Sequence, residues 1–301
     1  MTAGTPATRR ATLIGLTAVL MFSTLALLAV LSGPVPPFQT VAMAFAVASA
    51  IGLGIAWARG KTPVRLLHLP PAAWALGIYG LFGYHFAYFT AVKLAPPVEA
   101  NLINYLWPLL IVLGSALLPG ERLRLNHVAG ALLGFAGCAV LILKSGGLRG
   151  GGSAWGYAAA VAAALIWSSY SVLCRRSADR IPTEAVTGFC AATAVLAAIC
   201  HFLLETTVVP DAVGWAGIAG LGLGPVGLAF FTWDFGVKHG DIRLLGTAAY
   251  AAPLLSTVWV VLAGLGEFSG AVVLACALIV GGACLAAWNL GGNGGKARGV
   301  R

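Results

Sequence analysis

The sequence predicts an all-α integral membrane protein, in which ten transmembrane helices form two inverted five-helix repeats and both termini lie in the cytoplasm. Three observations lead to this fold: an apolar composition, a series of long apolar runs, and similarity between the two halves of the chain. Of 301 residues, 59% are hydrophobic and 9% are charged, whereas soluble domains carry about 25% charged residues. This composition excludes a soluble enzyme, a nucleic-acid-binding protein and a disordered chain. The net charge of +9 therefore reports on membrane topology.

Ten apolar runs are each long enough, or nearly so, to cross a bilayer, which takes about 20 residues. In order, they cover 11–31, 38–58, 72–92, 98–118, 128–144, 154–174, 183–203, 213–235, 244–264 and 269–290. The first run follows Arg9 and Arg10, as the apolar part of a signal peptide would. Nine further spans follow it, so we expect a retained helix. Short loops with turn residues, such as Ser32-Gly33-Pro34, separate the runs.

The positive charges predict the orientation of these ten spans. With the N-terminus in the cytoplasm, 15 of the 18 Lys and Arg residues fall in cytoplasmic segments. Only Lys93, Lys144 and Arg149 fall outside. Cytoplasmic loops of membrane proteins carry an excess of Lys and Arg. The asymmetry therefore predicts that both termini are cytoplasmic.

The two halves of the chain resemble each other when one is shifted by 145 residues. Scarce residues coincide at this offset: Lys93 with Lys238, Tyr105 with Tyr250, Pro108 with Pro253, Ser23 with Ser168 and Pro37 with Pro182. We expect repeats at 11–144 and 154–290, a glycine-rich linker at 145–153 and a cytoplasmic tail at 291–301. Because five spans are an odd number, the second repeat enters the membrane from the opposite side. Secondary transporters commonly use this design.

The third span carries polar aromatic side chains within its apolar run. Tyr84, His85 and Tyr88 fall roughly on one helical face, and Tyr79 precedes them. His85 sits near the middle of the span, which makes it the deepest ionisable residue predicted from sequence. It either contacts a ligand or responds to protons, or it is a neutral histidine bonded to a neighbouring helix.

The fourth span carries a polar stripe. Asn101, Asn104, Tyr105 and Pro108 are spaced as one helical face. Such side chains suit hydrogen bonding to a ligand, and they equally suit packing between helices. Trp107 lies one position off the stripe, where it borders either the cavity or a neighbouring helix.

Corresponding spans in the second half complete the candidate substrate site. Trp167 and Ser168 lie in the sixth span and Tyr250 lies in the ninth. Pro108 and Pro253 occupy matching positions and each removes a backbone hydrogen bond, so we expect a helix bend at both. Matching bends in two repeats indicate a binding region, although a tolerated kink is an equally common explanation.

The charged residues and cysteines narrow the possible ligands. The acidic residues all fall in loops or near span ends: Glu99, Glu121, Asp179, Glu184, Glu205, Asp211, Asp234, Asp241 and Glu267. No Lys or Arg is predicted deep in the membrane either, so a neutral or zwitterionic solute fits best. We expect the six cysteines to be small buried apolar residues: Cys138, Cys174, Cys190, Cys200, Cys276 and Cys284. We expect no metal site, no cofactor, no ATP-driven step, no nucleic acid and no obligatory protein partner.

Short motifs are spread along the whole chain. They are Thr12-Leu13-Ile14-Gly15-Leu16, Glu99 with Asn104-Tyr105-Leu106-Trp107-Pro108, Ile166-Trp167 with Tyr170, and Tyr250 with Pro253-Leu254-Leu255-Ser256. With these motifs the chain resembles the drug/metabolite transporter superfamily, EamA branch, and within it the YddG-type aromatic amino acid exporters. The resemblance implies export of aromatic and some other neutral amino acids across the bacterial inner membrane, through a central cavity. It also implies that Tyr105, Trp107 and Trp167 matter. Phe22 departs from the Trp that such proteins often have before Ser-Thr.

Three hypotheses follow from the sequence. The chain is an alternating-access exporter of aromatic and other neutral amino acids, an exporter of another small neutral metabolite or drug, or a lipid-embedded enzyme or scaffold. The third lacks a catalytic constellation. The absence of a carboxylate within the spans favours facilitated diffusion over proton exchange, with His85 as the group that could change this.

Overall fold

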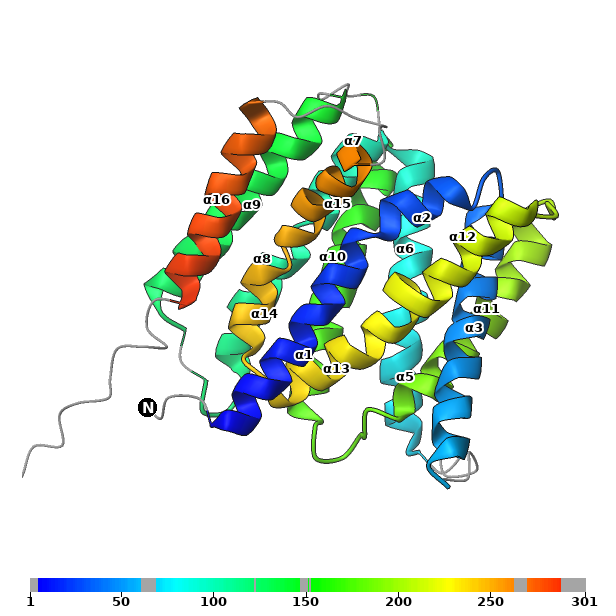
Figure 1. Ribbon diagram of the computed structural model, residues 1–301, viewed down its shortest axis with the longest axis horizontal. Coiled ribbons are helices and arrows are strands. Elements are labelled where there is room, and N and C mark those ends of the chain that lie inside the picture. Colours follow the sequence, from blue (N-terminus) through cyan, green and yellow to red (C-terminus); the bar gives the residue numbers. More distant parts are fainter. Residues whose placement is uncertain are drawn as a thin grey trace, which may run out of the picture.

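The computed structural model describes residues 5–60, 69–121, 123–146, 151, 153–262 and 270–287, and all regular structure in these ranges is helical. The first half contains α1 (Pro6–Ser23), α2 (Leu25–Leu31), α3 (Pro37–Ala58), α5 (Pro71–Ile78), η1 (Tyr79–Gly83), α6 (Tyr84–Leu94), α7 (Pro97–Asn104), α8 (Trp107–Gly114), η2 (Ser115–Leu117) and α9 (Leu125–Gly146). The second contains α10 (Ala154–Arg176), α11 (Ala185–Leu204), α12 (Ala212–Leu223), η3 (Gly224–Leu228), α13 (Ala229–His239), α14 (Ile242–Ala248), α15 (Ala251–Leu262) and α16 (Gly270–Ala287). Figure 1 shows them packed as a bundle.

Each of the ten predicted apolar ranges contains helix in the part that the structure describes. Six helical stretches are long and apolar enough to cross a membrane: Pro6–Leu31, Pro37–Ala58, Glu99–Leu117, Ala154–Arg176, Ala185–Leu204 and Ala212–His239. Some of the charged residues that were assigned to loops or tails lie outside the described residues: Lys61, Arg65, Arg122, Arg149, Glu267, Lys296, Arg298 and Arg301. The tail 291–301 and part of the linker 145–153 also lie outside them.

Several spans predicted as continuous helices are interrupted. The first predicted span divides into α1 and α2 at Thr24. The fourth divides at residues 105–106, shortly before Pro108, and the ninth at residues 249–250, shortly before Pro253. A proline has no N–H to offer the carbonyl four residues earlier. Both interruptions therefore fall where a proline removes a helical hydrogen bond.

Two π-helical segments interrupt the third and eighth spans at equivalent places. The segment Tyr79–Gly83 is η1, and Gly224–Leu228 is η3, with both ends displaced by 145 residues. Single π-turns inside α-helices are rare and occur frequently at functional sites. In η1, Gly80 lies directly against the ring of Tyr170, where an added Cβ would be 2.1 Å from the ring. Glycine is therefore required here for α10 to approach.

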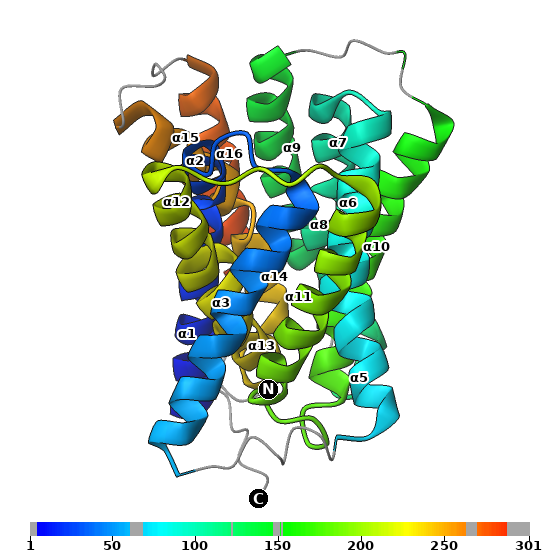
Figure 2. The same cartoon turned by 90° about the vertical axis from the view of Figure 1, so that its right-hand side faces the viewer.

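Helices of the two halves interleave rather than forming separate bodies. Helix α3 lies beside α11 (Figure 2), α1 packs against α13, and α6 packs against α10. The crossing of α1 and α13 depends on two glycines, because a Cβ on Gly236 would lie 2.5 Å from the Cα of Gly15. An extensive interface between the halves follows from this packing.

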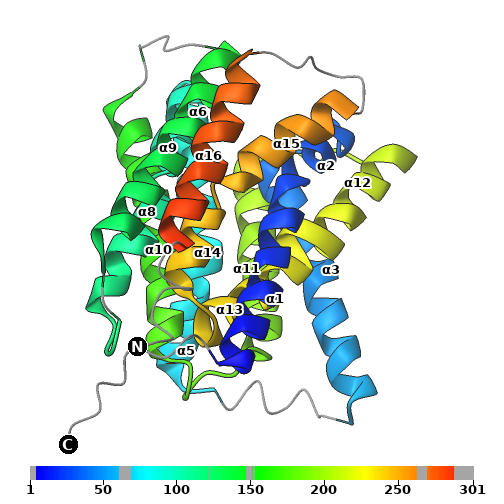
Figure 3. The same cartoon turned by 60° about the vertical axis from the view of Figure 1, so that its left-hand side comes forward.

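The pair α9 and α16 packs at one side of the bundle (Figure 3). Its close approach depends on Gly130 and Gly282, since a Cβ on Gly130 would lie 2.5 Å from the Gly282 carbonyl oxygen. The G-x-x-x-G motif at Gly130 and Gly134 thus serves packing within the protein. On the same helix pair, Cys138 is buried, whereas Cys276 and Cys284 are exposed.

The prediction that all six cysteines are buried is therefore wrong for Cys276 and Cys284, and Cys200 is only half-buried. These side chains belong to apolar helices, on faces that the described part of the chain leaves uncovered. In a membrane, such faces contact lipid, where a small apolar side chain has no need of burial. The sequence pattern could not distinguish a protein-facing cysteine from one that faces outward.

Candidate functional site

A cavity of about 800 Å³ lies between helices of both halves. Its wall is formed by segments of α1, α2, α3, α6, α7, α8, α10, α13 and α15, among others. It reaches the surface at Gly33, Pro37 and Pro97, all of which are exposed. No Asp, Glu, Lys or Arg is among the described residues that line it. The volume and the uncharged lining are those of a site for a small organic molecule.

The inner end of the cavity is aromatic. Trp107, Trp167 and Phe230 line it, and the rings of Trp107 and Trp167 meet edge to face with centroids 6.3 Å apart. Phe230 lies 5.4 Å from Trp167. Behind them Trp233 is fully buried and lies 5.6 Å from Trp107. The layer forms a closed floor that offers ring edges and faces to an apolar group.

Polar atoms gather on one wall, between α6 and α7. The Tyr88 hydroxyl donates to Asn101 Oδ1 at 2.7 Å, and Asn104 Nδ2 donates to the Tyr84 hydroxyl oxygen at 3.2 Å. Tyr105, in the break after α7, also lines the cavity. Of the two interpretations of this stripe, hydrogen bonding between helices is observed, because Asn101 and Asn104 of α7 bond to tyrosines of α6. Ligand contact stays a prediction for these side chains, which also line the cavity.

His85 lines the cavity with its ring held in place. Its Nδ1 lies 2.7 Å from the carbonyl oxygen of Leu81, which can only accept, so Nδ1 carries a proton and donates. In a neutral ring, Nε2 is then an acceptor. The rings of Phe45 and Tyr84 each lie 5.1 Å from the imidazole. The hydrogen bond of His85 thus stays within its own span and does not reach a neighbouring helix, as one interpretation from sequence required. Its side chain lines the cavity, and ligand contact stays a prediction.

Four of the predicted site residues do not line the cavity. Tyr79 is exposed and bonds Ser169 at 2.8 Å. Ser168 donates to the Leu165 carbonyl at 3.1 Å. Tyr250 is fully buried, and its hydroxyl accepts from the Leu109 N–H at 3.1 Å. The fourth is Pro108, which is buried inside α8, although its counterpart Pro253 does line the cavity.

The lining residues that were not predicted include two aromatic side chains, Phe22 and Phe230. Phe22 lies 145 residues before Trp167, and Phe230 lies 145 residues after His85. The offset that revealed the repeat could therefore have found both. Phe22 carried a further signal, because it stands where similar proteins often have Trp, whereas Phe230 carried none.

Asp234 lies near the end of its helix, as predicted, but with Lys238 it forms an ion pair whose burial was not predicted. Asp234 and Lys238 are 1% and 3% exposed, and Lys238 Nζ lies 2.7 Å from Asp234 Oδ2. Thr183 donates to the same oxygen at 2.6 Å, and Lys238 also donates to the Ile181 carbonyl at 2.8 Å. His85 is thus not the only buried ionisable side chain, because the segment before α11 covers this pair.

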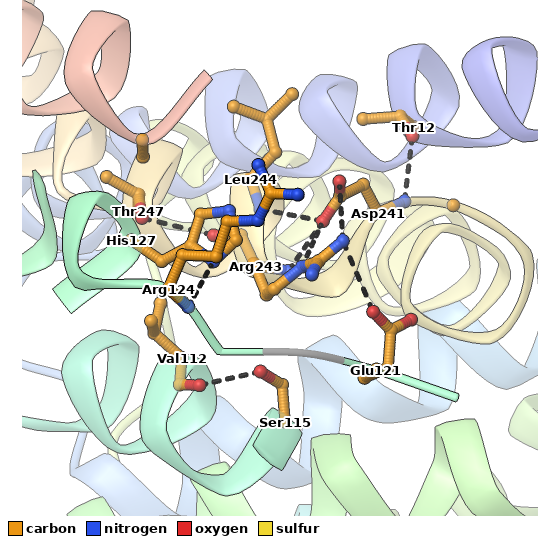
Figure 4. A network of polar contacts seen from close by, with 12 residues as sticks. Thr12, Val112, Ser115, Glu121, Arg124, His127, Asp241, Arg243, Leu244 and Thr247 are labelled. Atoms are coloured by element: carbon orange, nitrogen blue, oxygen red, sulfur yellow. Dashed lines mark hydrogen bonds and ion pairs between the residues drawn. The ribbon is translucent and has the colours of Figure 1, made fainter. Parts of the chain in front are cut away.

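A polar network connects the two halves at the end of the bundle opposite the cavity mouth (Figure 4). Glu121 of the first half pairs with Arg175 at 3.3 Å and with Arg243 at 3.2 Å, both from the second. Arg243 also pairs with Asp241 at 3.3 Å. The Asp241 N–H donates to Thr12 Oγ1 at 2.9 Å. These contacts hold the halves together at this end.

Helix α10 shows that the network and the cavity mouth lie at opposite ends. At its start, the Ser153 N–H donates to the Leu94 carbonyl at 2.9 Å, close to Pro97 at the mouth. In its last turn, Arg175 joins the network and donates to the Lys238 carbonyl at 2.5 Å. The structure is therefore open at one end and closed at the other.

Comparison with known proteins identifies the family. The EamA-like transporter family matches residues 9–143 and again 154–288. A protein of Ancylobacter novellus named aromatic amino acid exporter YddG is 56% identical over 282 residues, which cover 92% of this chain and 96% of that protein. Proteins of the same name from Salmonella typhimurium and Escherichia coli are each 24% identical, over 83% of this chain and 87% of each relative.

A solved crystal structure has the same fold, with a TM-score of 0.88 and 55% sequence identity over 93% of this chain and 98% of that chain. Together with the apolar helical stretches, the bacterial exporters among its relatives make this chain a multi-pass protein of the bacterial inner membrane. Because the family model matches almost all of the sequence in two copies, the chain belongs to the EamA-like transporter family.

Proposed function

We propose that this chain is a secondary transporter that exports aromatic and other neutral amino acids through the central cavity by alternating access. The observation that carries the proposal is the cavity of about 800 Å³ with an aromatic floor, a polar wall and no charged side chain among its described lining residues. The name of the relative that is 56% identical, an aromatic amino acid exporter, supports the same substrate class.

The cavity chemistry suits an amino acid with an apolar or aromatic side chain. Trp107, Trp167 and Phe230 offer ring surfaces for stacking and burial, while Asn101 and Asn104 offer amides for the polar end. A net cation without a carboxylate partner, or a phosphate without Lys or Arg, would be poorly solvated here. A zwitterion, with both charges on the ligand itself, carries no net charge into the site.

We further propose ten membrane spans in two inverted repeats, 11–144 and 154–290. Two residue pairs at the 145-residue offset support this: the rings of His85 and Phe230 lie 6.2 Å apart, and those of Phe22 and Trp167 lie 6.5 Å apart. A residue contacts its own equivalent only near a twofold axis. The equivalent segments η1 and η3 support the same relation. A twofold axis through the cavity floor would relate the two repeats, so that equivalent helices of the two halves lie on opposite sides of this axis.

The orientation we propose puts both termini in the cytoplasm. Positive residues support it, because Arg175, Arg243 and Lys238 lie together at the closed end of the bundle. The cavity mouth then faces the outside, and the structure is an outward-open state. In this orientation the linker 145–153 lies on the outer side of the membrane and the tail 291–301 lies in the cytoplasm.

Transport requires the cavity to close at its present mouth and to open at the opposite end of the bundle. When the contacts of Glu121 with Arg175 and Arg243 break, the cytoplasmic ends of the halves separate, and the aromatic floor opens toward the cytoplasm. The interruptions at residues 105–106 and 249–250 give two equivalent places where the chain can bend. A substrate taken up from the cytoplasm then leaves through the mouth near Gly33 and Pro97.

Uptake of labelled Trp and Thr into liposomes containing the purified protein tests this function. We expect protein-dependent flux of both amino acids, with and without a pH gradient. Flux of Trp only with the gradient would make proton coupling part of the mechanism and would direct mutagenesis to His85. If neither amino acid moves, the cavity serves another small neutral metabolite and the proposal fails.

A further inference from the structure

Asn104 places an unpartnered hydrogen-bond acceptor in the cavity wall. The residue is 4% exposed and lines the cavity. Its Nδ2 donates to the Tyr84 hydroxyl oxygen at 3.2 Å, but its buried Oδ1 has no donor in the part of the chain that the structure describes. A buried acceptor without a donor is unfavourable. A ligand that brings a donor to this point would satisfy it.

The amide cannot be satisfied by turning it round. With oxygen and nitrogen exchanged, the Tyr84 hydroxyl would donate to the oxygen, and the NH₂ group would then need an acceptor in the same place. The neighbouring Asn101 differs, because its Oδ1 already accepts from Tyr88 at 2.7 Å. Of these two amides, it is therefore Asn104 whose buried oxygen has no donor in the part of the chain that the structure describes.

The backbone at Asn104 offers a second acceptor. The carbonyl of Asn104 would accept from the residue four positions later, but that residue is Pro108, which has no N–H. An acceptor side chain and a carbonyl without its helical donor thus belong to one residue. An ammonium group, which has three N–H donors, can bond to both.

Aromatic rings surround the same point. The rings of Tyr84 and Tyr88 are stacked with centroids 6.0 Å apart, and Tyr84 lies 5.4 Å from Trp167. Faces of such rings attract ammonium groups. The cavity floor begins at Trp167, so a molecule held here by its ammonium can extend an apolar side chain onto the floor.

We propose that Asn104 Oδ1 and the backbone carbonyl of Asn104 bind the α-ammonium group of the substrate. The inference rests on the proposed function, since it assigns one part of an amino acid to one part of the cavity. It makes Asn104 the residue that separates amino acids from the corresponding carboxylic acids that lack the amine.

Competition against labelled Trp, bound to the purified protein, tests this assignment. The competitors are unlabelled Trp, indole-3-propionate, which lacks the ammonium, and tryptamine, which lacks the carboxylate. In the wild type we expect Trp to compete far better than indole-3-propionate. The variant Asn104→Leu keeps the side-chain volume but removes the acceptor. In this variant the affinity for Trp should fall about tenfold or more, as for loss of a charge-assisted hydrogen bond. The affinity for indole-3-propionate is measured by direct binding of its labelled form and should change less than twofold.

Two further variants keep the test decisive. Asn104→Asp retains the shape and adds a negative charge, so the affinity for tryptamine should rise about tenfold relative to that for Trp. Asn101→Leu is the matched control on the same helix, and it should not change the ratio between Trp and indole-3-propionate. Equal losses for both ligands in Asn104→Leu, or an unchanged preference for tryptamine in Asn104→Asp, would overturn the ammonium assignment. If Trp does not bind the wild type at all, it is the proposed function that fails.

Discussion

Neutralising Glu121 should open the closed end of the protein. This carboxylate pairs with Arg175 at 3.3 Å and Arg243 at 3.2 Å, with side chains between 12% and 25% exposed. Exposed pairs contribute about 0.2–1 kcal/mol, and hydrogen bonds to charged groups about 1.5–3 kcal/mol. For partly buried pairs we take about 1 kcal/mol each. Glu121→Gln should thus weaken the closed end by about 2 kcal/mol, which is about a 30-fold shift toward the state open to the cytoplasm.

Distances between spin labels at the two sides of the network measure this shift. Suitable positions are Leu125, which is 84% exposed at the start of α9, and Arg180, which is exposed just beyond α10. The native cysteines are first replaced, and flux is checked. In double electron–electron resonance, the variant should gain a population with a longer distance. Asp179→Asn is the control, because Asp179 is an exposed carboxylate that forms no ion pair with the residues that the structure describes. A population ratio that Glu121→Gln changes by less than twofold would refute the role of this network.

Three other predictions address the cavity, the buried ion pair and the packing. Trp167→Ala should lower Trp flux about tenfold more than Thr flux, because only the larger substrate loses ring contact; equal losses would mean that Trp167 is purely structural. Asp234→Asn should cost about 3–5 kcal/mol of stability by leaving Lys238 buried without a counter-charge, and the thermal midpoint should largely recover when Lys238→Met is added. Gly130→Val should lower the thermal midpoint, since its Cβ meets the Gly282 carbonyl, whereas at Gly281, where nothing lies within 4 Å, the same change should have little effect.

Much of the fold follows from the sequence, since in lipid every backbone N–H and C=O group must form its hydrogen bond within the protein. Apolar runs of about 20 residues must be helices in a bilayer, and every predicted range contains helix in the part that the structure describes. The interruptions near Pro108 and Pro253 also follow from local chemistry. The break in η3 coincides with Pro225, which also has no N–H. The breaks at Thr24 and in η1 contain no proline, and in η1 the ring of Tyr170 from α10 packs against Gly80.

The candidate site is harder to predict, because equivalent residues of the two halves have different neighbours. Tyr105 lines the cavity, whereas the hydroxyl of Tyr250 accepts a hydrogen bond from the Leu109 N–H in the first turn of α8. Asp234 and Lys238 looked like residues at a span end, but the segment with Ile181 and Thr183 covers them. Contacts between distant parts of the chain decide both cases.

Trans-stimulated exchange tests alternating access most directly. Liposomes that contain the protein are loaded with unlabelled Phe and diluted into labelled Trp. A carrier with a single cavity that faces one side at a time predicts a transient accumulation of labelled Trp above the outside concentration, at least severalfold faster than in liposomes without Phe. Labelled Trp that enters at the same rate with and without internal Phe, and never exceeds the outside concentration, would contradict the account.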